Sequence, residues 1–169
     1  PGSQDICFLQ GTDYQSFLAR RCPEAFREGD IVDSRGKVLG RHRGIAVYTV
    51  GQRKGLGIAA SQPLYVKQID VVNNRILVDR KERLLIQELS VERVNWTTHA
   101  PPALPVSLSV KVRYRTPEVP AEIAAGSNGG VRVRFEQPQP PVAPGQAAVF
   151  YDGDVVLGGG VITGCTWRG

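Results

Sequence analysis

The chain has 169 residues, of which 41% are hydrophobic and 22% charged, so it is long enough for one globular domain or two small ones. No apolar run approaches the roughly 20 residues of a membrane span, and no secretory signal opens the chain, so we expect a cytoplasmic protein. The net charge of +5 permits a polyanionic partner such as nucleic acid. The chain has three cysteines, with no C-x-x-C pair, and only two histidines. We therefore expect neither a disulfide framework nor a metal site.

The first predicted element is a helix in "GTDYQSFLARR", residues 11–21. Thr12 and Gln15 have the spacing of a capping box, and apolar side chains recur at helical spacing behind them. Pro23 predicts the end of this helix.

After the helix the pattern changes to strands. Residues 30–40 predict a hairpin around Ser34-Arg35-Gly36, and the apolar residues 44–50 predict a buried strand. Residues 64–72 and 75–80 predict a second hairpin, because the Asn73-Asn74 pair between them tolerates the positive φ of a tight turn. Residues 82–89 fit either a helical turn or a strand.

The last part of the chain predicts a small antiparallel barrel. Prolines at 101, 102 and 105 suit a linker or the entry to a strand, and the 19 glycines of the chain favour short strands and turns. The strand-like segments are residues 106–114, 119–125, 131–138, 146–151 and 155–162. Gly158 to Gly160 are expected to allow close backbone approach or a bulge rather than to hold a ligand.

The predicted fold is therefore mainly β: a short N-terminal helix, a small central β-rich module and a C-terminal antiparallel β-barrel. The predicted boundaries are 1–25 for the leading segment, 26–95 for the central module, 96–163 for the barrel and 164–169 for a tail.

The glycine-rich stretch "GQRKGLG", Gly51 to Gly57, matches neither common phosphate-binding fingerprint. Three residues instead of four separate its first two glycines, Lys54 precedes Gly55, and no helix signal follows. Two interpretations remain: a loop that presents Arg53 and Lys54 to a phosphate backbone, or a solvated turn.

Two predicted strands alternate basic and apolar residues. The alternation places Lys111, Arg113 and Arg115 on one face of a strand, with Val110, Val112 and Tyr114 on the other. Arg132 and Arg134 alternate with apolar residues in the same way. These arginines form either a face that binds phosphates or a solvated outer face balanced by Glu118, Glu122 and Glu136.

Cys7 lies in "SQDICF", between Ile6 and Phe8, where it is either a buried core residue or a sulfur kept for chemistry. His42 and His99 have no visible carboxylate or cysteine partner and are interpreted as surface or turn residues.

Several stretches together resemble the bacterial and organellar tRNA-specific 2-thiouridylases. They are "SQDICF", "GDIVDSRGKVLGRHRGIAVYTVGQRKGLGI", "VRYRTP" and "PVAPGQAAVFYDGDVVLGGGVI". The resemblance runs from Ser3 to about Ile162, nearly the whole chain.

This resemblance implies a sulfurtransferase that adenylates the wobble uridine of tRNA with ATP and then replaces its 2-oxygen with sulfur. The sulfur arrives from a cysteine desulfurase, directly or through a sulfur-relay carrier protein, and the persulfide-bearing cysteine of the family corresponds to Cys7. A second family cysteine, which would form a disulfide with the first, matches neither Cys22 nor Cys165. The resemblance also implies a monomer that makes no membrane contact.

The family's tRNA contacts in the barrel correspond to Arg113, Tyr114 and Gln146. Arg53, Lys54 and Arg115 are weaker candidates for the same role.

The family's ATP-binding pyrophosphate loop does not occur in this sequence, so the chain is expected to be a C-terminal part that is inactive alone and binds no cofactor itself. The alternative from a different class is a standalone RNA-binding or translation-factor-like β-barrel without catalysis.

Overall fold

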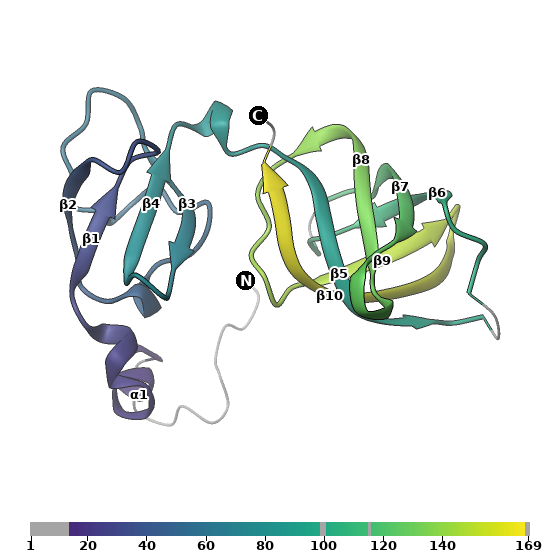
Figure 1. The fold of residues 1–169 in the computed structure, drawn as a ribbon, viewed down its shortest axis with the longest axis horizontal. Helices are drawn as coiled ribbons and strands as arrows, with labels where there is room; N and C mark the ends of the chain where they lie inside the picture. Colours follow the sequence, from purple (N-terminus) through teal and green to yellow (C-terminus); the bar gives the residue numbers. More distant parts are fainter. Residues whose placement is uncertain (1–13, 99–100, 115, 168–169) are drawn as a thin grey trace, which may run out of the picture. The chain divides into compact units, whose positions relative to one another are not determined.

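The computed structural model describes residues 14–98, 101–114 and 116–167 and divides the chain into two compact units after Arg80 (Figure 1). The sequence placed this boundary near residue 95. The structure places it earlier because β5 (Ile86–Trp96) pairs with β8 and β10 and is a strand of the barrel.

The first unit is a helix followed by a four-stranded sheet, and we call it the sheet unit. Its elements are α1 (Tyr14–Arg21), η1 (Pro23–Phe26), β1 (Gly29–Val32), β2 (Val38–His42), η2 (Ile45–Val47), β3 (Tyr65–Asp70) and β4 (Arg75–Asp79). The strand order is β2-β1-β4-β3, with β1 and β4 parallel and the other two pairs antiparallel.

The predicted helix and both predicted hairpins are confirmed. The last bond of the helix runs from the Cys22 N–H to the Leu18 carbonyl, and Pro23 follows. Thr12 of the predicted capping box lies outside the described residues. In the β3–β4 hairpin Asn74 takes a φ of 51°, as a tight turn of this kind requires.

The prediction of a buried strand over residues 44–50 is wrong. The segment forms the short 3₁₀ turn η2, closed by a hydrogen bond from Tyr48 to the Ile45 carbonyl. It is apolar because Tyr48, with Leu56 of the following loop, packs on the core of the sheet unit. A short apolar run signals burial, and periodicity alone does not say which backbone form is buried.

The second unit is the predicted antiparallel barrel, and it is closed by six strands, of which β5 is not among the predicted five. Its elements are η3 (Lys81–Arg83), β5, β6 (Val106–Lys111), β7 (Val119–Ala125), η4 (Ser127–Gly129), β8 (Val131–Gln139), β9 (Ala147–Asp152) and β10 (Val155–Trp167). The strands close in the order β10-β5-β8-β7-β6-β9. Residues 82–89, for which the sequence fits either a helical turn or a strand, form the end of η3 and the start of β5.

Gly158 to Gly160 allow β10 to pass close to both of its neighbours, as expected. A β-carbon at Gly159 would lie 2.6 Å from the Ala148 carbonyl oxygen, and one at Gly160 would lie 2.6 Å from the Glu92 carbonyl oxygen. Any larger residue would push apart strand pairs that close the barrel. These glycines are therefore structural.

Among the described residues, no helix is both long enough and apolar enough to cross a membrane.

Candidate nucleic-acid interface

The barrel brings Arg113, Tyr114 and Gln146 to one of its ends. Arg113 and Tyr114 follow the last residue of β6, and Gln146 immediately precedes the first residue of β9. These strands are paired antiparallel with Lys111 opposite Val149, so the end of β6 lies beside the start of β9.

Tyr114 projects into solvent and not towards the barrel core, so its predicted place on the same face as Val110 is wrong. β6 stops at Lys111, and a bond from the Thr116 N–H to the Arg113 carbonyl turns the chain immediately afterwards. The alternation of a strand therefore does not continue, and Tyr114 is 92% exposed. Arg115 lies outside the described residues.

Arg113 links the two loops of this end. Its exposed side chain donates through Nη2 to the carbonyl of Pro141, a buried residue on the segment that leads to Gln146. A guanidinium has five N–H donors, so this bond leaves others available for a phosphate. Arg113 can thus hold the loop and contact a ligand.

Gln146 has a fixed backbone and an exposed side chain. Its carbonyl accepts from the Ile162 N–H at 2.8 Å, and the Gly145 N–H donates to the Ile162 carbonyl at 2.8 Å. The amide is therefore presented to solvent from a position tied to β10. Together with Arg113 and Tyr114 it offers an aromatic ring, a cation and an amide at one end of the barrel.

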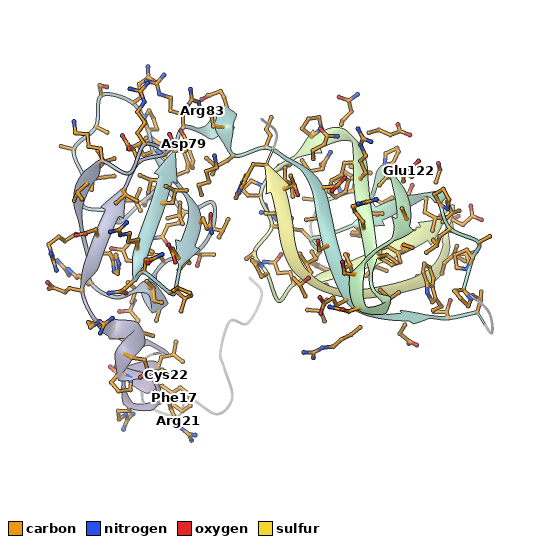
Figure 2. All side chains as sticks on the ribbon, viewed as in Figure 1. Phe17, Arg21, Cys22, Asp79, Arg83 and Glu122 are labelled. Carbon is orange, nitrogen blue, oxygen red and sulfur yellow. The ribbon has the colours of Figure 1, made fainter. Side chains whose placement is uncertain are left out.

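The arginines of β8 lie on the outer face of the barrel, and the carboxylates opposite Arg134 favour the solvated interpretation for that residue. Arg132 and Arg134 are exposed, whereas Val133 between them is buried, as the alternation predicts. Arg134 lies opposite Glu88 on one side and Glu122, labelled in Figure 2, on the other.

In the sheet unit, the "GQRKGLG" loop is held by Gln52. The backbone of Gln52 and of its neighbour Gly51 pairs with Val66 of β3 at 2.9 and 2.7 Å. The Gln52 amide accepts from the Thr49 N–H at 2.9 Å and donates to the Lys54 carbonyl at 2.9 Å.

The same loop exposes its two cations. Leu56 is buried and anchors the loop, whereas Arg53 and Lys54 at its tip are exposed. Gly55 and Gly57 take φ values of 79° and 66°, which favour glycine. The loop is therefore a fixed support for two adjacent positive charges.

Beside Arg53 the loop borders an open hollow of about 370 Å³. Its lining residues are Arg53, Gly55, Leu56, Gly57, Ile58, Ala60, Ser61, Gln62, Pro63 and Leu64. The chain leaves this hollow into β3 and not into a helix, so the loop is not followed by the helix N-terminus of a phosphate-binding loop.

The described cysteines differ in environment. Cys22 is exposed directly after α1, and Cys165 is half-buried in β10, where burial raises the pKa of its thiol. A raised pKa disfavours the thiolate that sulfur exchange requires. Cys7 lies outside the described residues.

His42 is buried, so its interpretation as a surface or turn residue is wrong. Its Nδ1 accepts from the Gly44 N–H at 3.1 Å, and its Nε2 lies 3.0 Å from the Asn74 carbonyl oxygen, to which it donates in the neutral tautomer. The ring ties β2 to the β3–β4 turn and has a structural role. His99 lies outside the described residues.

No three described His, Cys, Asp or Glu side chains are grouped so as to hold a metal ion.

Two family models match consecutive parts of the chain and agree with its division into two units. Residues 15–80 match the tRNA methyl transferase PRC-barrel domain, and residues 86–162 match the aminomethyltransferase beta-barrel domain.

Curated relatives match nearly the whole chain. A tRNA-specific 2-thiouridylase MnmA from Microcystis aeruginosa is 49% identical over 98% of this chain and 47% of its own length. Proteins of the same name from Magnetococcus marinus and Trichormus variabilis are each 46% identical, over 95% and 96% of this chain and 45% and 46% of their own lengths. The chain thus spans about half the length of the curated relatives it matches.

Proposed function

The chain belongs to the family of tRNA-specific 2-thiouridylases, and from that premise we propose that it is the tRNA-holding part of an enzyme that places sulfur on the wobble uridine of tRNA. The relatives' names supply the reaction and the substrate, and the chain supplies surfaces suited to that substrate. The observation that carries the proposal is the end of the barrel, where Tyr114 is 92% exposed beside Arg113 and Gln146.

The three groups at this end suit single-stranded or looped RNA. An exposed ring such as that of Tyr114 gains most when an unpaired base stacks on it. The guanidinium of Arg113 suits a phosphate, and the amide of Gln146 can bond to a ribose hydroxyl or a phosphate oxygen. Arg53 and Lys54 of the sheet unit, and Arg115, are proposed as further phosphate contacts.

Cys7 is proposed as the residue that carries the sulfur. Its thiolate would take a sulfane sulfur from the persulfide of a cysteine desulfurase or a sulfur-relay protein, whose own thiolate leaves. The outer sulfur of the Cys7 persulfide would then attack C2 of the adenylated uridine, and AMP would leave with the 2-oxygen. A second cysteine thiol, in the part of the relatives that this chain does not match, would cleave the S–S bond, form a disulfide with Cys7 and leave 2-thiouridine. The burial of Cys165 supports the choice, because that thiol is less able to ionise.

ATP has no proposed site in this chain. The "GQRKGLG" loop leads into β3 and not into a helix, and we place the ATP-dependent activation of the uridine in the part of the relatives that this chain does not match.

The tRNA-binding part of the proposal is tested by titrating the chain with tRNA. Replacing Tyr114 with Ala should weaken binding about tenfold, because stacking on one base contributes roughly 1–3 kcal/mol. Tyr114→Phe is the matched control: it keeps the ring and should keep most of the affinity. No tRNA binding by the unchanged chain, or equal affinity in Tyr114→Ala, would contradict this part.

The catalytic part is tested in a chimera in which this chain replaces the matching 168 residues of the Microcystis aeruginosa relative. Cys7→Ser should abolish 2-thiouridine formation while tRNA binding persists, with Cys22→Ser as the control that retains activity. Thiolation that survives Cys7→Ser would remove the catalytic role proposed for Cys7.

A further inference from the structure

One end of the four-stranded sheet collects three segments that are distant in sequence. β1 and β4 run parallel with Val32 opposite Leu77, so the turn after β1 and the end of β4 lie at the same end (Figure 1). The start of the "GQRKGLG" loop is there too, because Gly51 and Gln52 bond to Val66, and Val66 lies opposite Val78 of β4.

Five exposed cations lie on these segments, and we call them the cationic end. They are Arg35 and Lys37 of the β1–β2 turn, Arg53 and Lys54 of the loop, and Arg80 after β4. Within the described residues, none of the five forms an ion pair. Nitrogen-tipped side chains project from this end in Figure 2, beyond the labelled Asp79.

The carboxylates at this end are already engaged. One oxygen of Asp33 accepts from the backbone N–H groups of Arg35 and Lys37, at 2.9 Å each, which fixes the turn. Asp79 is almost buried and lies 3.4 Å from the Lys67 ammonium. The five cations therefore face solvent with little compensation.

The cations on the face of the same sheet are, by contrast, matched by carboxylates. Arg41 lies 3.7 Å from Asp30 and 3.8 Å from Glu28. In register, Asp30 is flanked by Arg41 and Arg75, and Arg75 is opposite Asp70, so charges alternate across all four strands. Among the cations of the four strands and of these three segments, those without a carboxylate opposite are thus the five of the cationic end.

The sheet unit also carries most of the surplus charge of the chain. Residues 1–80 hold 12 of the 21 Lys and Arg and 8 of the 16 Asp and Glu, whereas residues 81–169 hold 9 and 8. Long-range attraction for a polyanion therefore comes mainly from the sheet unit.

We propose that the cationic end binds the phosphate backbone of RNA and supplies most of the salt-dependent part of the affinity, a role separate from that of Tyr114 on the barrel. The inference rests on the proposed function for the identity of the RNA. The three inter-strand spacings from β2 to β3 make the end about 14 Å wide, enough for several phosphates.

An RNA backbone fits this surface better than an acidic protein does. Protein interfaces depend on a central group of buried apolar or aromatic anchors. Of the large hydrophobic side chains exposed in the described residues, only Val38, 53% exposed, lies on the segments of this end. The hollow beside Arg53 adds polar lining from Ser61 and Gln62.

The test is a tRNA titration of the 169-residue chain at several salt concentrations. The triple variant Arg35→Gln, Arg53→Gln, Lys54→Gln should bind at least tenfold more weakly at 0.1 M salt. The slope of log K against log salt should become shallower by about two to three, because each lost phosphate contact removes about 0.7–0.9.

A charge-matched control separates a local contact from a general loss of charge. Arg41→Gln, Arg75→Gln and Arg134→Gln remove three cations that each lie opposite a carboxylate, and this variant should keep the slope within about one of the unchanged chain. Protection of Lys37 and Lys54 from acetylation by bound tRNA should accompany the slope change.

The outcomes distinguish this inference from the proposed function. If the unchanged chain binds tRNA and the Arg35, Arg53, Lys54 variant keeps both affinity and slope, the cationic end is not an RNA site, although Tyr114 can still be one. If both triple variants lose the same slope, the effect is one of net charge and the inference fails. Poly-glutamate binding that depends on these three residues, with tRNA binding unchanged, would overturn it in favour of an acidic protein.

Discussion

The two units of this chain differ in how their strands are arranged around a buried core. The barrel closes on itself, and its described core comprises 14 buried residues, with contributions from all six strands. The sheet unit has two edge strands and a described core of six buried residues, two of which, Tyr48 and Leu56, come from non-strand segments.

The difference shows where each unit places its polar groups. In the barrel, the exposed Arg134 lies between Glu88 and Glu122 of the two neighbouring strands. In the sheet unit, polar side chains such as His42 and Gln52 hold loops and turns in place, and five exposed cations lie together at the cationic end. The barrel is held mainly by burial, and the sheet unit needs specific hydrogen bonds as well.

The largest expected effect is on the barrel core. Phe135→Ala should lower the free energy of unfolding by about 3–5 kcal/mol, since Phe135 is almost fully buried and its removal leaves a cavity. Both tryptophans, Trp96 and Trp167, are in the barrel, so the loss should be seen in denaturant titrations by Trp fluorescence. Glu136→Ala, on the exposed face of the same strand, should stay within about 0.5 kcal/mol. A similar loss of unfolding free energy in both variants would mean that burial of Phe135 is not the main source of the barrel's stability.

A smaller effect is expected from His42→Ala in the sheet unit. The change leaves the Gly44 N–H and the Asn74 carbonyl without their partner and should cost about 2–3 kcal/mol. Circular dichroism should detect this loss, while the Trp fluorescence transition of the barrel should not move. Arg43→Ala, the exposed neighbour, is the control. A shift of the Trp transition in His42→Ala would show that the two units unfold together.

The smallest effect concerns the β3–β4 turn. A hydrogen bond from the Asn73 side chain, with one from its backbone, holds the pKa of Asp70 below its ordinary value. A lowered folded-state pKa stabilises the turn above the unfolded pKa of about 4, and this contribution is lost as the pH falls through the lower folded value. Asn73→Ala should raise the pKa of Asp70 in an NMR titration. An unchanged pKa of Asp70 in Asn73→Ala would show that the Asn73 side chain does not lower it.

The amino-acid sequence by itself determined much of this protein. Periodicity gave the helix, the two hairpins and the barrel, because alternating burial leaves a period of two in β8 and turn residues mark its ends. The stretches that resemble the 2-thiouridylases indicated Arg113, Tyr114 and Gln146 as candidate tRNA contacts. That these residues lie at the same end of the barrel follows only from the pairing of β6 with β9.

Other features were decided only by tertiary structure. The burial of His42 depends on Asn74, 32 residues away, and the apolar run at 44–50 is a covering turn because the sheet it covers is made of distant strands. The cationic end exists because parallel pairing of β1 with β4 brings Arg35, Arg53 and Arg80 to the same end of one sheet. Local patterns record which residues are buried or charged, and the long-range strand pairing determines which of them meet.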